Sequence, residues 1–324
     1  MNEPSIAGIS GAPKGYDAAA YGRDFQAFRA FAKREAPGML ILGPGLATET
    51  PEPWGMPSDI PGSISTAELL ASGGSDVDAF SYHHYGAASV RCEASRMPQT
   101  RLDDALSEEW LARTSVTHAY YAALRDRYAP GKPIWMTEGA DAACGGNPWG
   151  GTFIYSFRYL DQLGRLAKQG VQVSIHNTLA AGSYSLLDPE DFRPKANYWA
   201  ALLWHRLMGA TVLDAGMPRQ PGLHVYAHCQ PDRAGGVALL VINNDAARTA
   251  SITLPGKRLR YTLSAPDAPS MGVKLNGQLL RLGANDRLPV LTGFSERSPV
   301  ASFAPRTISF LAMPKAENPA CKSH

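Results

Sequence analysis

Long apolar runs, an excess of one charge and cysteine motifs are all scarce in this sequence. No window reaches the roughly 18 consecutive apolar residues of a membrane-spanning helix. The 31 Lys and Arg nearly balance the 29 Asp and Glu, for a net charge of +2, so electrostatics does not favour nucleic acid or a membrane surface as the main partner. The chain does not open on a basic segment followed by an apolar one, so the sequence predicts no signal peptide within these residues.

Only 4 cysteines are present, and none belongs to a CxxC pair, which argues against a metal site built on cysteine. Cys229 and Cys321 bracket the C-terminal region and are candidates for a disulfide that joins its first and last strands. The alternative is two unrelated buried thiols, and the sequence leaves both open.

Strand-like and helix-like segments alternate from residue 1 to about residue 210, with an apolar content of 44% that suits a folded globular protein. Such alternation predicts a parallel sheet with helices outside it. The predicted helices span 17–36, 64–72, 103–128, 152–169 and 195–208, and the predicted strands span 38–46, 76–85, 132–138 and 171–177.

Polar and aromatic residues stand at the ends of these strands, namely Glu3, His83, Tyr85, Glu138 and Asn177. A (β/α)8 barrel keeps its catalytic residues at that end of its strands. Counting the strand that must precede Glu3, about five of the eight barrel strands are represented, so we expect the chain to begin inside a domain. A doubly wound open sheet stays an alternative, although no GxGxxG turn supports it.

After residue 210 the pattern changes to short β-rich runs between Gly, Pro, Asn and Asp turns. These runs span 224–229, 237–243, 249–254, 260–263 and 307–311. The pattern predicts an antiparallel β-sandwich. The expected fold is therefore α/β plus all-β: the C-terminal portion of a TIM barrel over 1–210, from the end of strand 4 onward, and a β-sandwich domain over 211–324.

Two glutamates suggest carbohydrate chemistry. Glu3 lies in Asn2-Glu3-Pro4, and Glu138 ends the apolar strand 132–138. Hydrolysis of a glycosidic bond uses two carboxylates on either side of that bond. The structural alternatives are an ordinary surface carboxylate at Glu3 and a strand-terminal ion pair at Glu138. His83-His84 offers two side chains of a kind that binds metals, but no third ligand falls at zinc spacing, so a hydrogen-bonding role is the better interpretation.

Several stretches along the chain, in their order and spacing, form a family pattern. They are Asn2-Glu3-Pro4, His83-His84-Tyr85, Thr137-Glu138, and residues 159–164, 181–188, 197–199, 207–213, 225–229 and 275–277. With them the sequence resembles glycoside hydrolase family 79, the heparanase and β-glucuronidase family. The resemblance implies cleavage of β-linked glucuronic acid with retention of configuration, with Glu3 as acid/base and Glu138 as nucleophile. It implies no cofactor and no metal, because two carboxylates and water complete the reaction.

The resemblance also implies substrate-binding roles for Asn2, His83, Tyr85 and Tyr184, and for the backbone N–H groups of Gly145 and Gly146. Tyr184 and the two glycines would hold the uronic acid carboxylate. Animal heparanases carry a Tyr before the glycines that follow the nucleophile, whereas this chain has Ala143-Cys144-Gly145-Gly146-Asn147. Basic clusters are sparse, which favours a small or unsulfated glucuronide as substrate over heparan sulfate.

Two other functions remain open at this point. In the first alternative, the chain is a truncated, non-catalytic remnant that at most binds carbohydrate. In the second, it is a two-glutamate barrel hydrolase that acts on neutral glycosides. A carbohydrate is the expected partner in each case, and nothing fixes the oligomeric state or the compartment. Exported members of the family make a secreted or periplasmic location the expectation.

Overall fold

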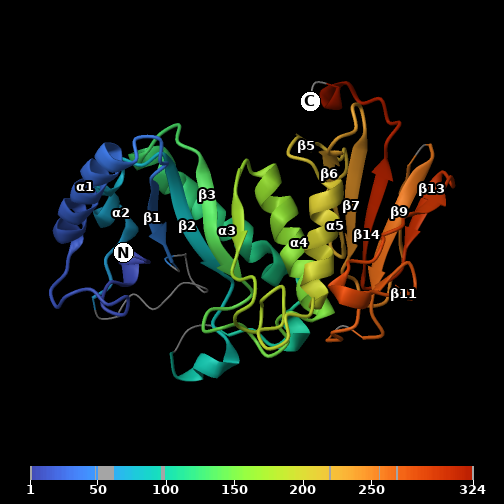
Figure 1. Cartoon of the computed structure of the whole chain (residues 1–324), viewed down its shortest axis with the longest axis horizontal. Coiled ribbons are helices and arrows are strands. Elements are labelled where there is room, and N and C mark those ends of the chain that lie inside the picture. Colours follow the sequence, from blue (N-terminus) through green and yellow to red (C-terminus); the bar gives the residue numbers. More distant parts are fainter. Residues whose placement is uncertain are drawn as a thin grey trace. The chain divides into compact units, whose positions relative to one another are not determined.

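The computed structural model describes residues 2–47, 49, 62–95, 99–218, 220–254, 256–267 and 269–322, and Figure 1 shows its ribbon. The chain forms two compact units. The first comprises residues 1–100, 112–146 and 165–177, and the second comprises 101–111, 147–164 and 178–324. Each unit is therefore built from three separate segments of the chain. The domain boundary expected near residue 210 stays a prediction.

The first unit is built on a four-stranded parallel sheet (Figure 1). Its strands are β1 (Leu42–Leu46), β2 (Ala79–Tyr85), β3 (Ile134–Ala140) and β4 (Ser174–His176). Their spatial order is β1-β2-β3-β4, so each strand pairs with the next one along the chain. A doubly wound sheet reverses its strand order at a switch point, and these four strands show no such reversal.

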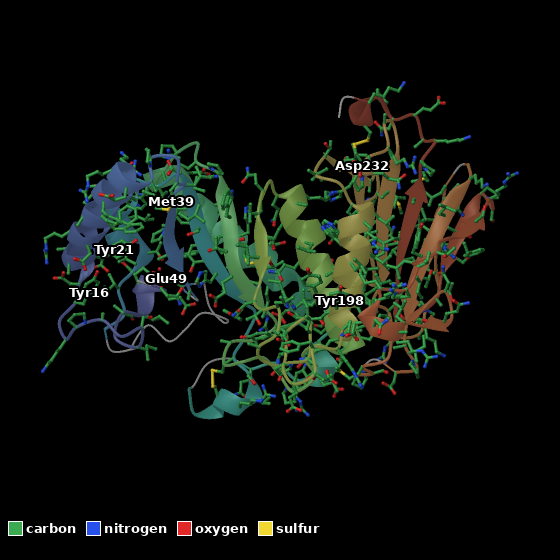
Figure 2. The ribbon with its side chains drawn as sticks, in the orientation of Figure 1. Tyr16, Tyr21, Met39, Glu49, Tyr198 and Asp232 are labelled. Atoms are coloured by element: carbon green, nitrogen blue, oxygen red, sulfur yellow. A yellow bond between two sulfur atoms is a disulfide. The ribbon has the colours of Figure 1, made fainter. Side chains whose placement is uncertain are left out.

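Helix α1 (Ala18–Glu35) illustrates how local sequence sets an element of this unit. Asp17 caps its first turn, because Oδ1 accepts a hydrogen bond from the N–H of Ala20 at 2.8 Å. Tyr21 and Phe25 lie one turn apart on the buried face, with their rings stacked at 5.9 Å, and Figure 2 labels Tyr21 on this helix. The short helix α2 (Thr66–Leu69) follows β1 and begins with a capping box made by Ser65 and Glu68.

Strand β2 divides its side chains between a core face and a second, polar face. Tyr82 stacks on Tyr121 of helix α3 (Glu108–Tyr128) with the ring centroids 5.0 Å apart, and His84 shares a 2.9 Å hydrogen bond with Thr117 of the same helix. Because side chains alternate along a strand, His83 and Tyr85 lie on the opposite face. One set of alternate side chains thus builds the core. The other set lies on the opposite face, with His83 and Tyr85 near the carboxyl end of the strand.

The second unit contains an antiparallel sheet in the order β11-β10-β9-β14-β7-β6-β5, with β12 paired to β9, and a two-stranded sheet of β8 and β13. The strands are β5 (Val212–Leu213), β6 (Leu223–Cys229), β7 (Val237–Asn243), β8 (Ala250–Thr253), β9 (Arg258–Ser264), β10 (Lys274–Leu275), β11 (Gln278–Leu279), β12 (Phe294–Glu296), β13 (Val300–Phe303) and β14 (Thr307–Met313). The fully buried strand β7 runs through the centre, because β6 and β14 pair with it on either side.

Each face of the larger sheet is covered within the second unit. On one face, Leu240 and Phe310 pack with Phe157 of α4 (Phe153–Lys168) and Leu203 of α5 (Ala196–Leu207) in one hydrophobic cluster. On the other face, Val241 and Leu311 share a cluster with residues of β8 and β13, including Ile252 and Phe303. Alternate residues of β7 and β14 therefore serve two separate cores.

Helix α3 begins later than the sequence predicts, at Glu108 instead of near Asp103. The reason is Ser107, whose Oγ accepts a hydrogen bond from the N–H of Trp110 at 3.1 Å, as expected of a residue that begins a helix. Residues Leu102–Asp104 form the short 3-10 helix η4 instead. No helix among the described residues is long and apolar enough to cross a membrane.

Two predicted strands are shorter in the structure. The strand predicted over 38–46 is paired only from Leu42, because the N–H of Ile41 donates to the side chain of Asp78 at 2.8 Å instead of to a neighbouring strand. The strand predicted over 171–177 is paired only over Ser174–His176. The sequence also missed strand β5 and strands β10 to β13, each of which has 4 residues or fewer.

Candidate active site

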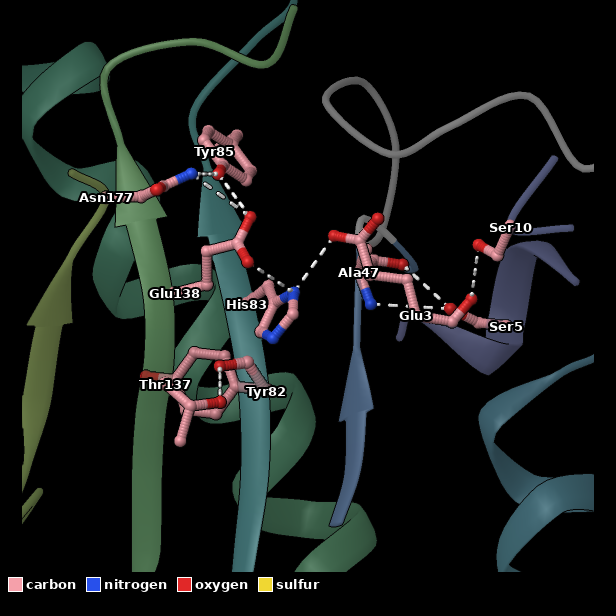
Figure 3. A network of polar contacts seen from close by, with 10 residues as sticks. All are labelled: Glu3, Ser5, Ser10, Ala47, Tyr82, His83, Tyr85, Thr137, Glu138 and Asn177. Carbon is pink, nitrogen blue, oxygen red and sulfur yellow. Dashed lines mark hydrogen bonds and ion pairs between the residues drawn. The ribbon is translucent and has the colours of Figure 1, made fainter. Parts of the chain in front are cut away.

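Glu3 lies at the carboxyl end of β1, although it belongs to a different segment of the chain. It directly precedes the 3-10 helix η1 (Pro4–Ile6) and has a left-handed backbone with φ 47°. The hydroxyl of Ser5 contacts the backbone N–H and the carbonyl of Ala47, both at 3.3 Å, just after β1 ends (Figure 3). The hydroxyl of Ser10 donates to the carbonyl of Glu3 at 3.2 Å. These bonds hold Glu3 against the sheet edge.

Glu138 reaches the same edge through a β-bulge in β3. Tyr82 pairs with Met136, but the next pair is His83 with Glu138, so Thr137 is an extra residue. Strict alternation would place Glu138 on the face of Met136, which lies in the core with Tyr82. The extra residue turns Glu138 onto the face of His83 instead, as bulges beside active sites often do.

His83 stands between the two carboxylates (Figure 3). Its Nδ1 atom lies 2.9 Å from Oε1 of Glu3 and 3.8 Å from Oε2 of Glu138, and its side chain is buried. One imidazole nitrogen therefore faces both acids. With its proton on Nδ1, His83 donates a hydrogen bond to Glu3 and lies within reach of Glu138.

Tyr85 and Asn177 hold the other oxygen of Glu138 (Figure 3). The Tyr85 hydroxyl donates to Oε1 at 2.5 Å, and Asn177 Nδ2 donates to the same Oε1 at 3.3 Å and to the Tyr85 hydroxyl at 2.7 Å. Oε2 is thereby turned toward His83 and Glu3. Asn177 was expected from the sequence at a strand end but not in the site; its position just after β4 was the available signal.

The nearest carboxylate oxygens of Glu3 and Glu138 lie within 4.8 Å of one another. This spacing is close to the about 5–5.5 Å between the carboxyl groups of retaining glycosidases, and shorter than the about 6.5–9.5 Å of inverting ones. Glu3, His83 and Glu138 also offer three ligand atoms of the kind that zinc accepts. A cation there would compete with the hydrogen bonds that His83 and Tyr85 make to the two carboxylates.

The loops that follow β2 and β3 are joined beside these residues. The carbonyl of Gly146 accepts hydrogen bonds from Ser89 Oγ at 2.7 Å and from Arg91 Nη1 at 2.8 Å. Cys92 and Cys144 form a disulfide between the same two loops. Gly145 and Gly146, predicted to bind substrate through their N–H groups, thus lie in a cross-linked loop that begins soon after Glu138.

Two further residues, Asn2 and Tyr184, were predicted to contact the substrate. Asn2 is exposed and makes no hydrogen bond within the described part of the chain. Tyr184 is buried and belongs to the second compact unit, where its carbonyl accepts a hydrogen bond from Asn197 at 2.9 Å. The substrate-binding roles of both residues stay predictions.

All four cysteines are paired. Cys229 and Cys321, which the sequence left open as a bridge, are joined with an S–S distance of 2.04 Å. The bond between Cys92 and Cys144 was not foreseen, because their flanking sequences show no shared pattern. Both bonds are drawn in yellow in Figure 2. Disulfides occur chiefly in proteins of oxidising compartments.

No family model matches the chain, but individual proteins do. The chain is 32% identical over 297 residues to heparanase-like protein 1 of Arabidopsis thaliana, covering 79% of this chain and 53% of that protein. It is 32% identical over 227 residues to baicalin-beta-D-glucuronidase of Scutellaria baicalensis, covering 65% and 43%. The human protein named inactive heparanase-2 is 31% identical over 242 residues, covering 67% and 40%.

The chain belongs to glycoside hydrolase family 79. This confirms the family resemblance found in the sequence motifs. The chain spans about half the length of the curated relatives that it matches. Among solved structures, it resembles a 4-O-alpha-L-rhamnosyl-beta-D-glucuronidase from Fusarium oxysporum with a TM-score of 0.65 and 16% identity, covering 97% of this chain and 69% of that one. At this identity the likeness shows a shared fold and not a shared activity.

Proposed function

We propose that this family 79 chain carries the catalytic pair of a retaining glycoside hydrolase that cleaves β-linked glucuronic acid. Glu138 is the nucleophile, and its Oε2 attacks carbon-1 of the sugar while Glu3 protonates the leaving oxygen. The glycosyl-enzyme ester then forms, and Glu3 takes a proton from the water that hydrolyses it. Neither step requires a metal or an organic cofactor.

The observation that carries the proposal is the spacing of the two carboxylates, whose nearest oxygens lie within 4.8 Å. Their surroundings also differ in a way that suits two roles. Oε1 of Glu138 accepts hydrogen bonds from Tyr85 and Asn177, which orients Oε2 for attack. Glu3 contacts His83, which is placed to stabilise the charge that develops on Glu3 when it gives up its proton.

The fold supports the same proposal. Four parallel strands in chain order, with polar residues at their carboxyl ends, suit the C-terminal portion of a (β/α)8 barrel. In that interpretation β1 to β4 are barrel strands 5 to 8 and Glu3 follows strand 4. The antiparallel sheet of the second unit, together with β8 and β13, would be the β-sandwich domain.

The proposed substrate is a small or unsulfated glucuronide. The relatives named for glucuronidase activity favour a uronic acid in the site, and the near-neutral charge of the chain does not favour a sulfated polymer. Tyr184 and the N–H groups of Gly145 and Gly146 would hold the sugar carboxylate, and Asn2 would contact the sugar.

Hydrolysis of 2,4-dinitrophenyl β-D-glucuronide by wild type, Glu138→Gln and Glu3→Gln tests the proposal. Glu138→Gln should lose activity by on the order of 10³-fold or more, because glutamine cannot form the glycosyl ester. Glu3→Gln should still form the ester with this good leaving group but turn over slowly. NMR of the first product should show the β-anomer, and dialysis against EDTA should leave the rate unchanged.

The same assay distinguishes the alternatives. A Glu138→Gln variant as active as wild type would refute the two-glutamate mechanism. Faster cleavage of xylosides or arabinosides than of the matching glucuronide would establish a hydrolase of neutral glycosides. A folded protein that binds glucuronate but cleaves no glycoside would establish the non-catalytic alternative, for which the relative named inactive is a precedent.

A further inference from the structure

The loop that follows Glu138 has an unusual backbone. Cys144, Gly145 and Gly146 have φ values of 62°, 79° and 85°, three successive residues in the left-handed region. Cys144 adopts this region without the freedom of glycine. Such a backbone persists only where surrounding contacts hold it, and it occurs preferentially at functional sites.

The contacts that hold this loop come from the loop after β2. Ala143 exchanges two backbone hydrogen bonds with that loop: Ser89 N–H donates to the carbonyl of Ala143 at 3.1 Å, and Ala143 N–H donates to the carbonyl of Ala87 at 2.8 Å. Ser89 is fully buried, and its Oγ also accepts a hydrogen bond from the N–H of Arg91 at 3.2 Å. The disulfide between Cys92 and Cys144 closes the connection covalently.

Arg91 makes the most specific of these contacts. Its Nη1 donates to the carbonyl of Gly146 at 2.8 Å and lies 3.4 Å from the carbonyl of Gly145. In a trans peptide the N–H points away from the carbonyl, so the N–H of Gly146 is turned away from Arg91. The N–H groups of Gly145 and Gly146 themselves donate no hydrogen bond within the described residues.

We propose that Arg91 is a positioning residue that fixes the Gly145–Gly146 backbone for contact with the uronic acid carboxylate. Ser89 and the disulfide between Cys92 and Cys144 complete this clamp. The substrate part of the inference rests on the proposed function. Arg91 acts through the loop and does not touch the reacting atoms, so its loss affects recognition of the carboxylate and leaves the Glu3 and Glu138 pair in place.

Steady-state kinetics of Arg91→Ala, Arg91→Lys and the control Arg34→Ala test this role. Arg34 is an exposed arginine of α1 in the same unit. On 4-nitrophenyl β-D-glucuronide, Arg91→Ala should raise KM roughly tenfold with little change in kcat, as expected from loss of an oriented hydrogen bond to a charged group. On the matching β-D-glucoside KM should change little. Arg91→Lys should recover part of the loss.

Hydrogen exchange of the Ala143 amide, which donates to the carbonyl of Ala87 at 2.8 Å, tests the clamp without any catalytic readout. Exchange should be faster in Arg91→Ala and in the Cys92→Ser, Cys144→Ser double variant than in wild type and Arg34→Ala. Unchanged exchange in both variants would overturn the clamp, whether or not the protein is a glycosidase. Faster exchange with equal losses on glucuronide and glucoside would overturn the role in carboxylate recognition and leave only a structural one.

Discussion

The Nδ1 atom of His224 lies 2.6 Å from Oδ1 of Asp161, and neither side chain is exposed. The other ring nitrogen, Nε2, lies 2.9 Å from Oε2 of Glu108. Tyr226 donates to the same oxygen of Asp161 at 2.5 Å. One imidazole of the second unit therefore joins the first turn of α3, helix α4 and strand β6.

This arrangement shifts two pKa values in opposite directions. Burial alone would lower the pKa of His224, but hydrogen bonds to Asp161 and Glu108 outweigh it and raise the pKa from 6.5 to about 9. Burial would raise the pKa of Glu108, but bonds from His224, Asn244 and the N–H of Gly222 lower it from 4.5 to about 2. The folded state thus favours a protonated His224 and an ionised Glu108.

The stability of the folded protein should consequently fall at both acidic and alkaline pH. The contribution of His224 is complete below pH 6.5 and is lost as the pH rises through about 9, because its folded pKa is raised. The contribution of Glu108 is complete above pH 4.5 and is lost as the pH falls toward about 2. We expect Tm, measured by differential scanning calorimetry, to be highest between these limits.

A His224→Gln variant tests the expected loss of stability at alkaline pH. It should lose about 3–5 kcal/mol of stability near pH 6, because Asp161 stays buried without its partner, and its Tm should fall less steeply between pH 6.5 and 9. His205→Gln, which alters an exposed histidine of α5, is the matched control. If both variants follow the wild-type pH profile, His224 is not the titrating group.

The close packing of α4 on β6 leads to a second prediction. A Cβ added to Gly164 would lie 2.4–2.6 Å from ring atoms of Tyr226, and the ring is held by its bond to Asp161. Gly164→Ala should therefore destabilise the protein by about 1–3 kcal/mol, measured by urea unfolding. Gly38→Ala, where a Cβ meets no atom within 4 Å, should change little. Equal effects in the two variants would contradict this packing argument.

These contacts show how far the sequence alone leads. The motifs 159–164 and 225–229 are recognisable one by one, and periodicity places the first on a helix and the second on a strand. That Asp161 of one meets Tyr226 of the other depends on tertiary packing, which local periodicity does not encode. The same limit explains why His224 and Glu108 were not singled out.

At the candidate site, the residue types were easier to predict than the face of the sheet on which each side chain lies. Glu138 and His83 lie near the carboxyl ends of β3 and β2, two residues before each strand ends, but strict alternation would have put Glu138 in the core. The bulge at Thr137 decides the outcome, and Thr-Glu-Gly has no feature that separates a bulge from a regular strand. The proximity of Glu3 to His83 joins residues 80 positions apart through the anchoring of Ser5 at Ala47.

The disulfide between Cys229 and Cys321 supports a third prediction. It links the last residue of β6 to the 3-10 helix η6 (Pro319–Cys321), 92 positions further along the chain. Closing a long loop lowers the entropy of the unfolded chain, so the Cys229→Ala, Cys321→Ala variant should lose about 2–5 kcal/mol of stability, measured by guanidinium unfolding. A non-reducing peptide map should first show this pair in the wild type. Unchanged unfolding in the variant would contradict the entropic argument.

The last prediction compares two tyrosines of β2 that face opposite ways. Tyr85→Phe removes the hydroxyl that donates to Oε1 of Glu138, so under the proposed mechanism kcat/KM on an aryl β-glucuronide should fall by about 10- to 100-fold. Tm should change little, because Tyr85 is only partly buried.

Tyr82→Phe is the matched control for this comparison. The hydroxyl of Tyr82 is buried with no hydrogen-bond partner in the described structure, so its removal should keep kcat/KM and either keep or raise Tm. The opposite ranking, with activity lost in Tyr82→Phe and retained in Tyr85→Phe, would place the reacting carboxylate on the other face of the sheet. Equal losses in both variants would show that β2 responds as a unit, and that the Tyr85 to Glu138 bond has no separate role in the reaction.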